Sequence, residues 1–167
     1  MKRKKAIIFG ISGQDGAYLS NFLLKKNYEV FGTTRNKSKK NLYRLQKLKI
    51  LNKVKLIKCS FVSIKFVDSL LEKNKNIQEI YYLAGEPSVT KSFTNPENSI
   101  KTNTVGILNI LLSIKKIKKK IKVFNASSAQ IFGNNKDNFY SELSNIAPTT
   151  PYAVSKASGY WLTKIFR

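Results

Sequence analysis

The feature that most constrains this chain is a regular alternation of short apolar runs with longer amphipathic segments. The runs have the length of buried strands, and the segments between them carry apolar residues at helical spacing. Strands are expected at 6–9, 28–33, 54–59, 80–83 and 122–126. Helices are expected at 14–26, 42–51, 67–72, 98–114 and 152–166. This order predicts an α/β fold of the Rossmann type, a doubly wound parallel sheet with helices on both faces.

Three glycines follow the first expected strand and open the first expected helix. Gly10, Gly13 and Gly16 have the spacing G-x-x-G-x-x-G. Glycine permits a tight turn and lets the backbone approach a pyrophosphate, whose charge is stabilised by amide groups at a helix N-terminus. We therefore expect a dinucleotide-binding turn. Its candidate cofactor-binding residues are Gly10, Ser12, Gly13, Gln14, Asp15 and Gly16.

The end of the second expected strand indicates which dinucleotide binds. A carboxylate about 20 residues after the glycines would hydrogen-bond the ribose of NAD. The segment 32–37 holds no carboxylate, and Arg35 offers a planar guanidinium group that suits a 2′-phosphate. The expected cofactor is therefore NADP, with Arg35 among its binding residues. The alternative is a solvated arginine on a basic surface.

Tyr152 and Lys156 are four residues apart, which places both side chains on one face of the last expected helix. A lysine close to a phenol stabilises the phenolate, so Tyr152 can accept a proton from a sugar hydroxyl. Ser128 follows the fifth expected strand, at the sheet edge where ligands gather in α/β folds, and can position that hydroxyl. Tyr152 and Lys156 are also expected to contact the coenzyme.

Composition limits the chemistry that is available. The chain has one cysteine, Cys59, and no histidine, so neither an internal disulfide nor a metal site is expected. Acid–base chemistry must therefore use tyrosine, lysine, or a carboxyl or amide group. No apolar run approaches the roughly 20 residues of a membrane span, and we expect a cytoplasmic protein. The length suits one domain, 1–167, in which only 133–150 reads as a long loop.

The formal net charge is +22, from 31 basic and 9 acidic residues. Such a field favours anions, including nucleic acids. The lysines are scattered over most segments expected to be exposed and form no stripe with interleaved aromatic residues, so no specific nucleic-acid partner is expected. A non-catalytic module that binds polyanions is the alternative that this charge leaves open.

Together these motifs resemble the extended short-chain dehydrogenase/reductase family, which contains the NAD-dependent epimerases and dehydratases, and within it the GDP-mannose 4,6-dehydratases. The likeness covers nearly the whole chain, and Gly-Gln-Asp-Gly-Ala-Tyr-Leu at 13–19 is its most specific part. It implies that Leu83 and Ala84 contact the coenzyme and that Tyr152 and Lys156 form the catalytic pair. In that family a nucleotide-activated sugar, here expected to be a GDP-hexose, is oxidised at C4, loses water across C5 and C6, and is reduced at C6. Family members often pair, so a homo-oligomer is expected.

The chain departs from that family at Gln130, which stands where these dehydratases have a glutamate, and an amide cannot act as the base. The resemblance also implies a sixth strand and a sugar-nucleotide region beyond Arg167. The leading interpretation is the N-terminal part of an NADP-dependent lyase that converts GDP-mannose to GDP-4-keto-6-deoxymannose, inactive as this segment alone. An NADP-dependent nucleotide-sugar epimerase or 4-ketoreductase is the alternative, because it needs no glutamate at this position. The candidate catalytic residues are Ser128, Gln130, Tyr152 and Lys156.

Overall fold

A parallel β-sheet forms the centre of the protein. The computed structural model describes residues 3–133 and 139–167, and within them five strands pair in the order β3-β2-β1-β4-β5. Every pairing is parallel, and β1 is paired on both sides, with Ile7 opposite Phe31 of β2 and Ile80 of β4. The strands are β1 (Lys5–Phe9), β2 (Glu29–Thr34), β3 (Lys55–Lys58), β4 (Ile77–Tyr82) and β5 (Lys122–Asn125).

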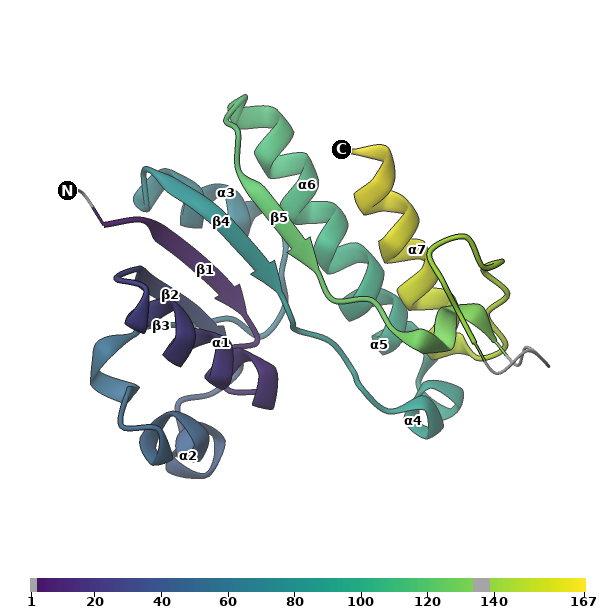
Figure 1. Ribbon diagram of the computed structural model, residues 1–167, viewed down its shortest axis with the longest axis horizontal. Coiled ribbons are helices and arrows are strands. Elements are labelled where there is room, and N and C mark those ends of the chain that lie inside the picture. Colours follow the sequence, from purple (N-terminus) through teal and green to yellow (C-terminus); the bar gives the residue numbers. More distant parts are fainter. Residues whose placement is uncertain (1–2, 134–138) are drawn as a thin grey trace.

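Helices cover the two faces of this sheet, as the sequence predicts (Figure 1). In β1, Ala6 and Ile8 pack into the apolar cluster shared with α1 (Gln14–Lys25) and α2 (Lys39–Lys47). Ile7 and Phe9 point to the opposite face, into the cluster built with α3 (Ile64–Lys73) and α6 (Gly106–Ile117). The alternation of strand side chains thus gives a central strand with two buried faces, which confirms the doubly wound Rossmann-type fold.

The helix expected at 98–114 contains a π-helical turn. The structure has α5 (Pro96–Ile100), a π-helical segment (Lys101–Val105) and then α6 in one continuous run. The hydroxyl of Tyr82 donates to the Thr102 carbonyl within the π-helical segment. Single turns of π-helix inside α-helices often occur at functional sites.

Two further features were not expected from apolar spacing. The short helix α4 (Val89–Thr94) is capped by Ser88, whose side chain accepts a hydrogen bond from the Lys91 backbone N–H. This helix is too short to show a periodic apolar face. The helix α2 begins three residues before the expected position 42, because the Ser38 side chain caps it by accepting from the Asn41 amide. The expected loop 133–150 includes residues 134–138, which lie outside the described residues.

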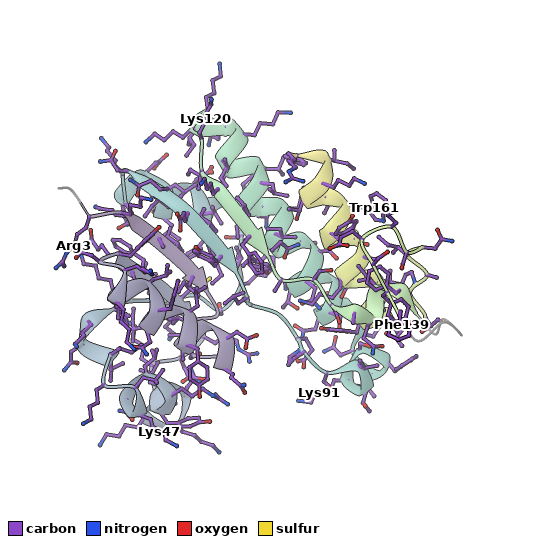
Figure 2. The ribbon with its side chains drawn as sticks, in the orientation of Figure 1. Arg3, Lys47, Lys91, Lys120, Phe139 and Trp161 are labelled. Atoms are coloured by element: carbon purple, nitrogen blue, oxygen red, sulfur yellow. The ribbon has the colours of Figure 1, made fainter. Side chains whose placement is uncertain are left out.

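Positive charge is spread over the whole surface. Figure 2 shows Lys47 on α2, Lys91 on α4 and Lys120 beside β5 projecting from widely separated parts of the molecule. This dispersal fits the interpretation of the +22 charge as a general surface property rather than one binding stripe. No helix in residues 3–133 and 139–167 is both long enough and apolar enough to cross a membrane.

Candidate active site

The candidate site lies where the winding of the sheet reverses. The chain moves outward through β1, β2 and β3, and then returns to place β4 on the other side of β1. Ligands of open α/β sheets bind at the carboxyl ends of the two strands that flank this switch point. A cleft of about 580 Å³ opens there, between the loop after β1 and the loop after β4. It is lined by Gly10, Ser12, Gly13, Gln14, Asp15, Gly16, Arg35, Leu83 and Ala84, among others, so every one of these predicted cofactor-binding residues meets in one place.

The glycine turn closes tightly between β1 and α1. Gly10 has φ of +87°, a conformation that suits glycine, and the Gly13 amide donates to the Gly10 carbonyl at 3.0 Å. A Cβ on Gly16 would overlap the Gly10 carbonyl oxygen and lie 2.8 Å from the Ile11 Cα. The turn is fastened to β2 as well, because the Ile11 amide donates to the Thr33 carbonyl at 3.1 Å. Glycine is therefore needed here for both conformation and helix–strand packing.

The first turn of α1 offers free amide groups to the cleft. Gly13 is the N-cap residue, and within the described part of the chain no side chain caps the helix. The first amides of a helix lack partners within the helix, and the helix dipole favours an anion beside them. Residues 10–16 thus provide what a pyrophosphate requires: close backbone approach, amide donors and a positive dipole end. A dinucleotide fits this part of the cleft on its observed chemistry.

Arg35 is exposed at the end of β2, where the sequence analysis expects a 2′-phosphate. Two residues that sequence reasoning missed line the same part of the cleft, Asn41 and Arg44 of α2. The Asn41 amide group donates to the Thr34 hydroxyl at 2.7 Å, and the Arg44 guanidinium donates to the Ser12 carbonyl at 3.4 Å. These bonds hold α2 against the glycine turn. Arg44 lies nine positions after Arg35 in the chain, and no sequence motif marks a basic residue at that spacing.

Tyr152 and Lys156 lie on the inner face of α7 (Pro151–Ile165). Tyr152 is buried, and the Lys156 ammonium stands 5.8 Å from the centre of its ring. The same ammonium donates to the Ala126 carbonyl just after β5, at 3.1 Å. It also lies 3.7 Å from the position that a Cβ on Gly85 would occupy, next to Ala84 in the cleft wall. The structure therefore brings the Tyr–Lys pair to the β4 side of this cleft.

Burial lowers the pKa of Lys156 below its ordinary value of 10.5. Within the folded protein the charged amine is disfavoured, so the unfolded chain binds more protons between the lowered pKa and 10.5. Folding stability must then rise with pH across that window, since the folded lysine loses its proton first.

We therefore expect wild-type protein to gain stability relative to Lys156→Met as the pH rises from 7 toward 10.5. Urea unfolding at a series of pH values measures this difference. The exposed α2 substitution Lys47→Met serves as the matched control, and its stability curve should run parallel to the wild-type curve. Parallel curves for Lys156→Met as well would contradict the assignment of the burial effect to this lysine.

Ser128 and Gln130 occupy the segment after β5. Ser128 is half-buried. Its hydroxyl accepts a hydrogen bond from the backbone N–H of Gln130 at 3.2 Å, which caps the 3₁₀ helix Ala129–Phe132. Ser128 is only two residues from Ala126, the residue that the Lys156 ammonium contacts. The Gln130 side chain is exposed. The hydrogen bond from Lys156 to Ala126 thus joins α7 to the end of β5, close in the chain to Ser128.

Polar contacts from two other elements fix the start of α7. The Ser92 hydroxyl of α4 accepts from the Tyr152 amide at 3.0 Å, and the buried Asn103 amide donates to the Ser155 hydroxyl at 3.0 Å. Asn103 also donates to the Glu86 carbonyl at 3.4 Å, so the π-helical segment links α7 to the loop after β4. The sequence analysis did not identify Ser92 or Asn103, because their role depends on contacts 52–60 residues apart in the chain.

The sequence of this chain matches a known protein family over most of its length. A family model described as GDP-mannose 4,6 dehydratase matches residues 7–167. GDP-mannose 4,6 dehydratase 2 of Caenorhabditis elegans is 35% identical over 99% of this chain and 46% of its own length. The GDP-mannose 4,6-dehydratase of Vibrio cholerae serotype O1 is 34% identical over 100% of this chain and 46% of its own length. The chain thus spans about half the length of these relatives.

Solved structures share the fold. The UDP-Glc/GlcNAc 4-epimerase of Campylobacter jejuni superposes with a TM-score of 0.86 at 24% identity, over 98% of this chain and 49% of its own. DesIV, a dTDP-glucose 4,6-dehydratase of Streptomyces venezuelae solved with NAD and TYD bound, gives a TM-score of 0.81 at 19% identity, over 97% of this chain and 51% of its own. At these identities the likeness establishes the architecture, and the chemistry has to be argued from the residues of the site.

Proposed function

Because the chain belongs to the GDP-mannose 4,6-dehydratase family, we propose that it forms the coenzyme-binding half of an NADP-dependent nucleotide-sugar dehydratase. The proposed substrate is GDP-mannose, and the product is GDP-4-keto-6-deoxymannose. The observation that carries the proposal is the position of the Lys156 ammonium, between the Tyr152 ring, the Ala126 carbonyl after β5 and the loop after β4 that walls the coenzyme cleft.

In this proposal each side chain has a separate task. The α1 amides and the glycine turn bind the pyrophosphate, and Arg35 binds the 2′-phosphate. When bound, the nicotinamide group supplies hydride-acceptor and hydride-donor chemistry. Lys156 stabilises the phenolate form of Tyr152, which accepts the proton of the sugar C4 hydroxyl and so becomes the neutral phenol, and Ser128 holds the hydroxyl in place. Proton transfer at C5 needs a further base, which the amide of Gln130 cannot supply.

The coenzyme preference gives a direct prediction for Arg35. Arg35→Ala is expected to weaken NADPH binding about tenfold to a hundredfold, because a charge-assisted hydrogen bond is worth about 1.5–3 kcal/mol. NADH binding should change little, since NADH has no 2′-phosphate. Titration followed by nicotinamide fluorescence measures both affinities. Lys37→Ala, an exposed cation two residues away, is the matched control. Equal loss of NADPH and NADH affinity in Arg35→Ala would reject the NADP assignment.

The chain by itself is expected to bind NADPH and to show little or no turnover of GDP-mannose. The observation behind this is that it spans only about half of each relative. Turnover should appear in a hybrid protein, defined as the Vibrio cholerae dehydratase in which this chain replaces the matching N-terminal part. Product formation is measured by chromatography of the sugar nucleotides. Rapid turnover by the 167-residue chain alone would overturn this expectation.

A second candidate function is an NADP-dependent nucleotide-sugar epimerase or 4-ketoreductase. Gln130 favours it, because oxidation and reduction at C4 require no carboxylate at that position. Both functions use the same Tyr152 and Lys156, so the sugar product rather than coenzyme binding separates them.

A further inference from the structure

Two arginines from different elements line the β2 side of the coenzyme cleft. Arg35 directly follows β2, and Arg44 lies on α2. Arg35 is exposed and Arg44 is half-buried, and neither forms an ion pair with a carboxylate in the described part of the chain. From the sequence, only Arg35 was expected to bind the coenzyme. Arg44 therefore brings a second positive charge to this cleft.

The side chain of Asn41 fixes the chain on both sides of Arg35. Its amide group donates to the Thr34 hydroxyl at 2.7 Å and to the Asn36 carbonyl at 2.8 Å, so it bonds the residue before Arg35 and the residue after it. The same group shares a longer hydrogen bond of 3.3 Å with the Ser12 hydroxyl, which lies 3.1 Å from the Thr34 hydroxyl. One side chain of α2 thereby joins the backbone around Arg35 to the glycine turn.

Arg44 follows Asn41 by three residues, so both side chains lie on the same face of α2. The Arg44 Nη1 donates to the Ser12 carbonyl at 3.4 Å, and the guanidinium carbon lies 4.6 Å from the centre of the Tyr43 ring. That hydrogen bond is long, and a guanidinium carries several further N–H donors. These donors make no other hydrogen bond within the described residues. They are therefore free to bind a ligand in the cleft.

The place of Arg44 in the cleft indicates which group it binds. The first amides of α1 already suit the pyrophosphate, whereas the adenosine ribose of a dinucleotide lies at the end of β2. Arg44 contacts the glycine turn on the side that faces β2, because the residue that it bonds, Ser12, also contacts Thr34. A planar guanidinium matches the oxygens of a phosphate. Two such groups at this strand end suit a dianionic 2′-phosphate better than a neutral ribose hydroxyl.

We propose that Arg44 is a second ligand of the coenzyme 2′-phosphate, beside Arg35, and that Asn41 is the positioning residue that holds α2 and the Arg35 backbone together at the glycine turn. The inference rests on the proposed preference for NADP. It adds to that proposal that the preference is shared between β2 and α2, and that it depends on a contact between them.

The test measures the selectivity of the chain, defined as the Kd for NADH divided by the Kd for NADPH. The two coenzymes differ only in the 2′-phosphate, and nicotinamide fluorescence reports the binding of each. Arg44→Gln removes the charge and keeps a polar amide, and it should lower the selectivity about tenfold. With Arg35→Ala added, the selectivity should fall to about one. Lys47→Gln, an exposed cation on the same helix, is the matched control and should keep the wild-type selectivity.

Two further variants separate binding of the phosphate from packing of α2. Arg44→Lys keeps the charge without the planar fork, so it should retain more selectivity than Arg44→Gln. A role in packing alone would make these two variants alike. Asn41→Ala should lower the selectivity about threefold or more, with the Kd for NADH within about twofold of wild type. The glycine turn keeps its own bond to β2 in this variant, from the Ile11 amide to the Thr33 carbonyl.

Two results would overturn this inference and leave the NADP preference intact. Arg44→Gln could weaken NADPH and NADH binding equally, which would assign Arg44 to the pyrophosphate or to the shape of the cleft. It could also leave both affinities unchanged, which would limit Arg44 to holding α2 against the glycine turn. Failure of the proposed function has a different signature. The wild-type chain would then show a selectivity of about one before any substitution, and both proposals would be rejected.

Discussion

Gly16→Ala is expected to abolish dinucleotide binding and to lower the free energy of unfolding by about 3 kcal/mol. The added Cβ would overlap the Gly10 carbonyl oxygen and come within 2.8 Å of the Ile11 Cα. Both are backbone atoms, so no side-chain rotation can relieve the contact. Either α1 moves away from β1, or the turn that presents amides to the pyrophosphate opens. Each response separates groups that the dinucleotide must contact together.

Urea unfolding and NADPH titration of the variant measure the two effects, and Gly13→Ala provides the control for folding stability. A Cβ on Gly13 would meet only the Gly10 carbonyl oxygen, at 3.3 Å, and Gly13 has φ of −67°, which alanine adopts readily. Its folding stability should therefore change by less than about 1 kcal/mol. NADPH affinity of Gly16→Ala within about tenfold of wild type would show that the turn adapts, and that the glycine spacing is not what fixes the cofactor site.

The sheet could be predicted from the sequence because each strand carries its own signal. A run such as 6–9 is apolar at successive positions, and only a strand buried on both faces explains this in a segment so short. The cluster memberships of Ile7 and Ile8, on opposite faces of β1, bear this out. The glycine turn was equally local, since three glycines between a strand and a helix define their own geometry.

Features that depend on contacts between distant segments could not be predicted in this way. The π-helical segment receives a hydrogen bond from Tyr82 on β4, and the start of α7 is bonded to Ser92 and Asn103. Arg44 reaches the glycine turn only because α2 packs against α1, 32 residues after the carbonyl that it contacts. Side chains of this kind have no fixed spacing from the motif that they support, so no local pattern reveals them.

The position of the Tyr–Lys pair could be predicted in part from a local pattern and depends in part on contacts between distant segments. The i, i+4 spacing places Tyr152 and Lys156 on one helix face without any knowledge of the fold. Their placement beside the Ala126 carbonyl and Gly85 depends instead on how α7 packs against segments distant in the chain, which no local pattern specifies. The roles of these residues in catalysis remain predictions that the hybrid protein can test.

Gln130→Glu in the hybrid protein is expected to raise the rate of water elimination from GDP-mannose about a hundredfold to ten-thousandfold, the range that a well-placed general base contributes. The backbone around position 130 should hold a carboxylate without rearrangement. The backbone N–H of Gln130 donates to the Ser128 hydroxyl at 3.2 Å, and the substitution leaves this bond in place. The Gln130 side chain is exposed, so its replacement removes no buried contact. NADPH affinity should stay the same, because residue 130 does not line the coenzyme cleft.

The measurement is the rate of formation of the 4-keto-6-deoxy sugar by Gln130, Gln130→Glu and Gln130→Ala hybrid proteins. If neither glutamine nor alanine supports elimination but both support exchange at C4, the natural chemistry is that of an epimerase or ketoreductase. If all three variants eliminate water equally fast, another carboxylate is the base. Glu86 is then the group to change, because it lies on the loop after β4 and that loop is joined to α7 through Asn103. Loss of elimination in Glu86→Gln, with NADPH binding retained, would assign the base to this loop and keep the dehydratase function, with the base after β4 rather than after β5.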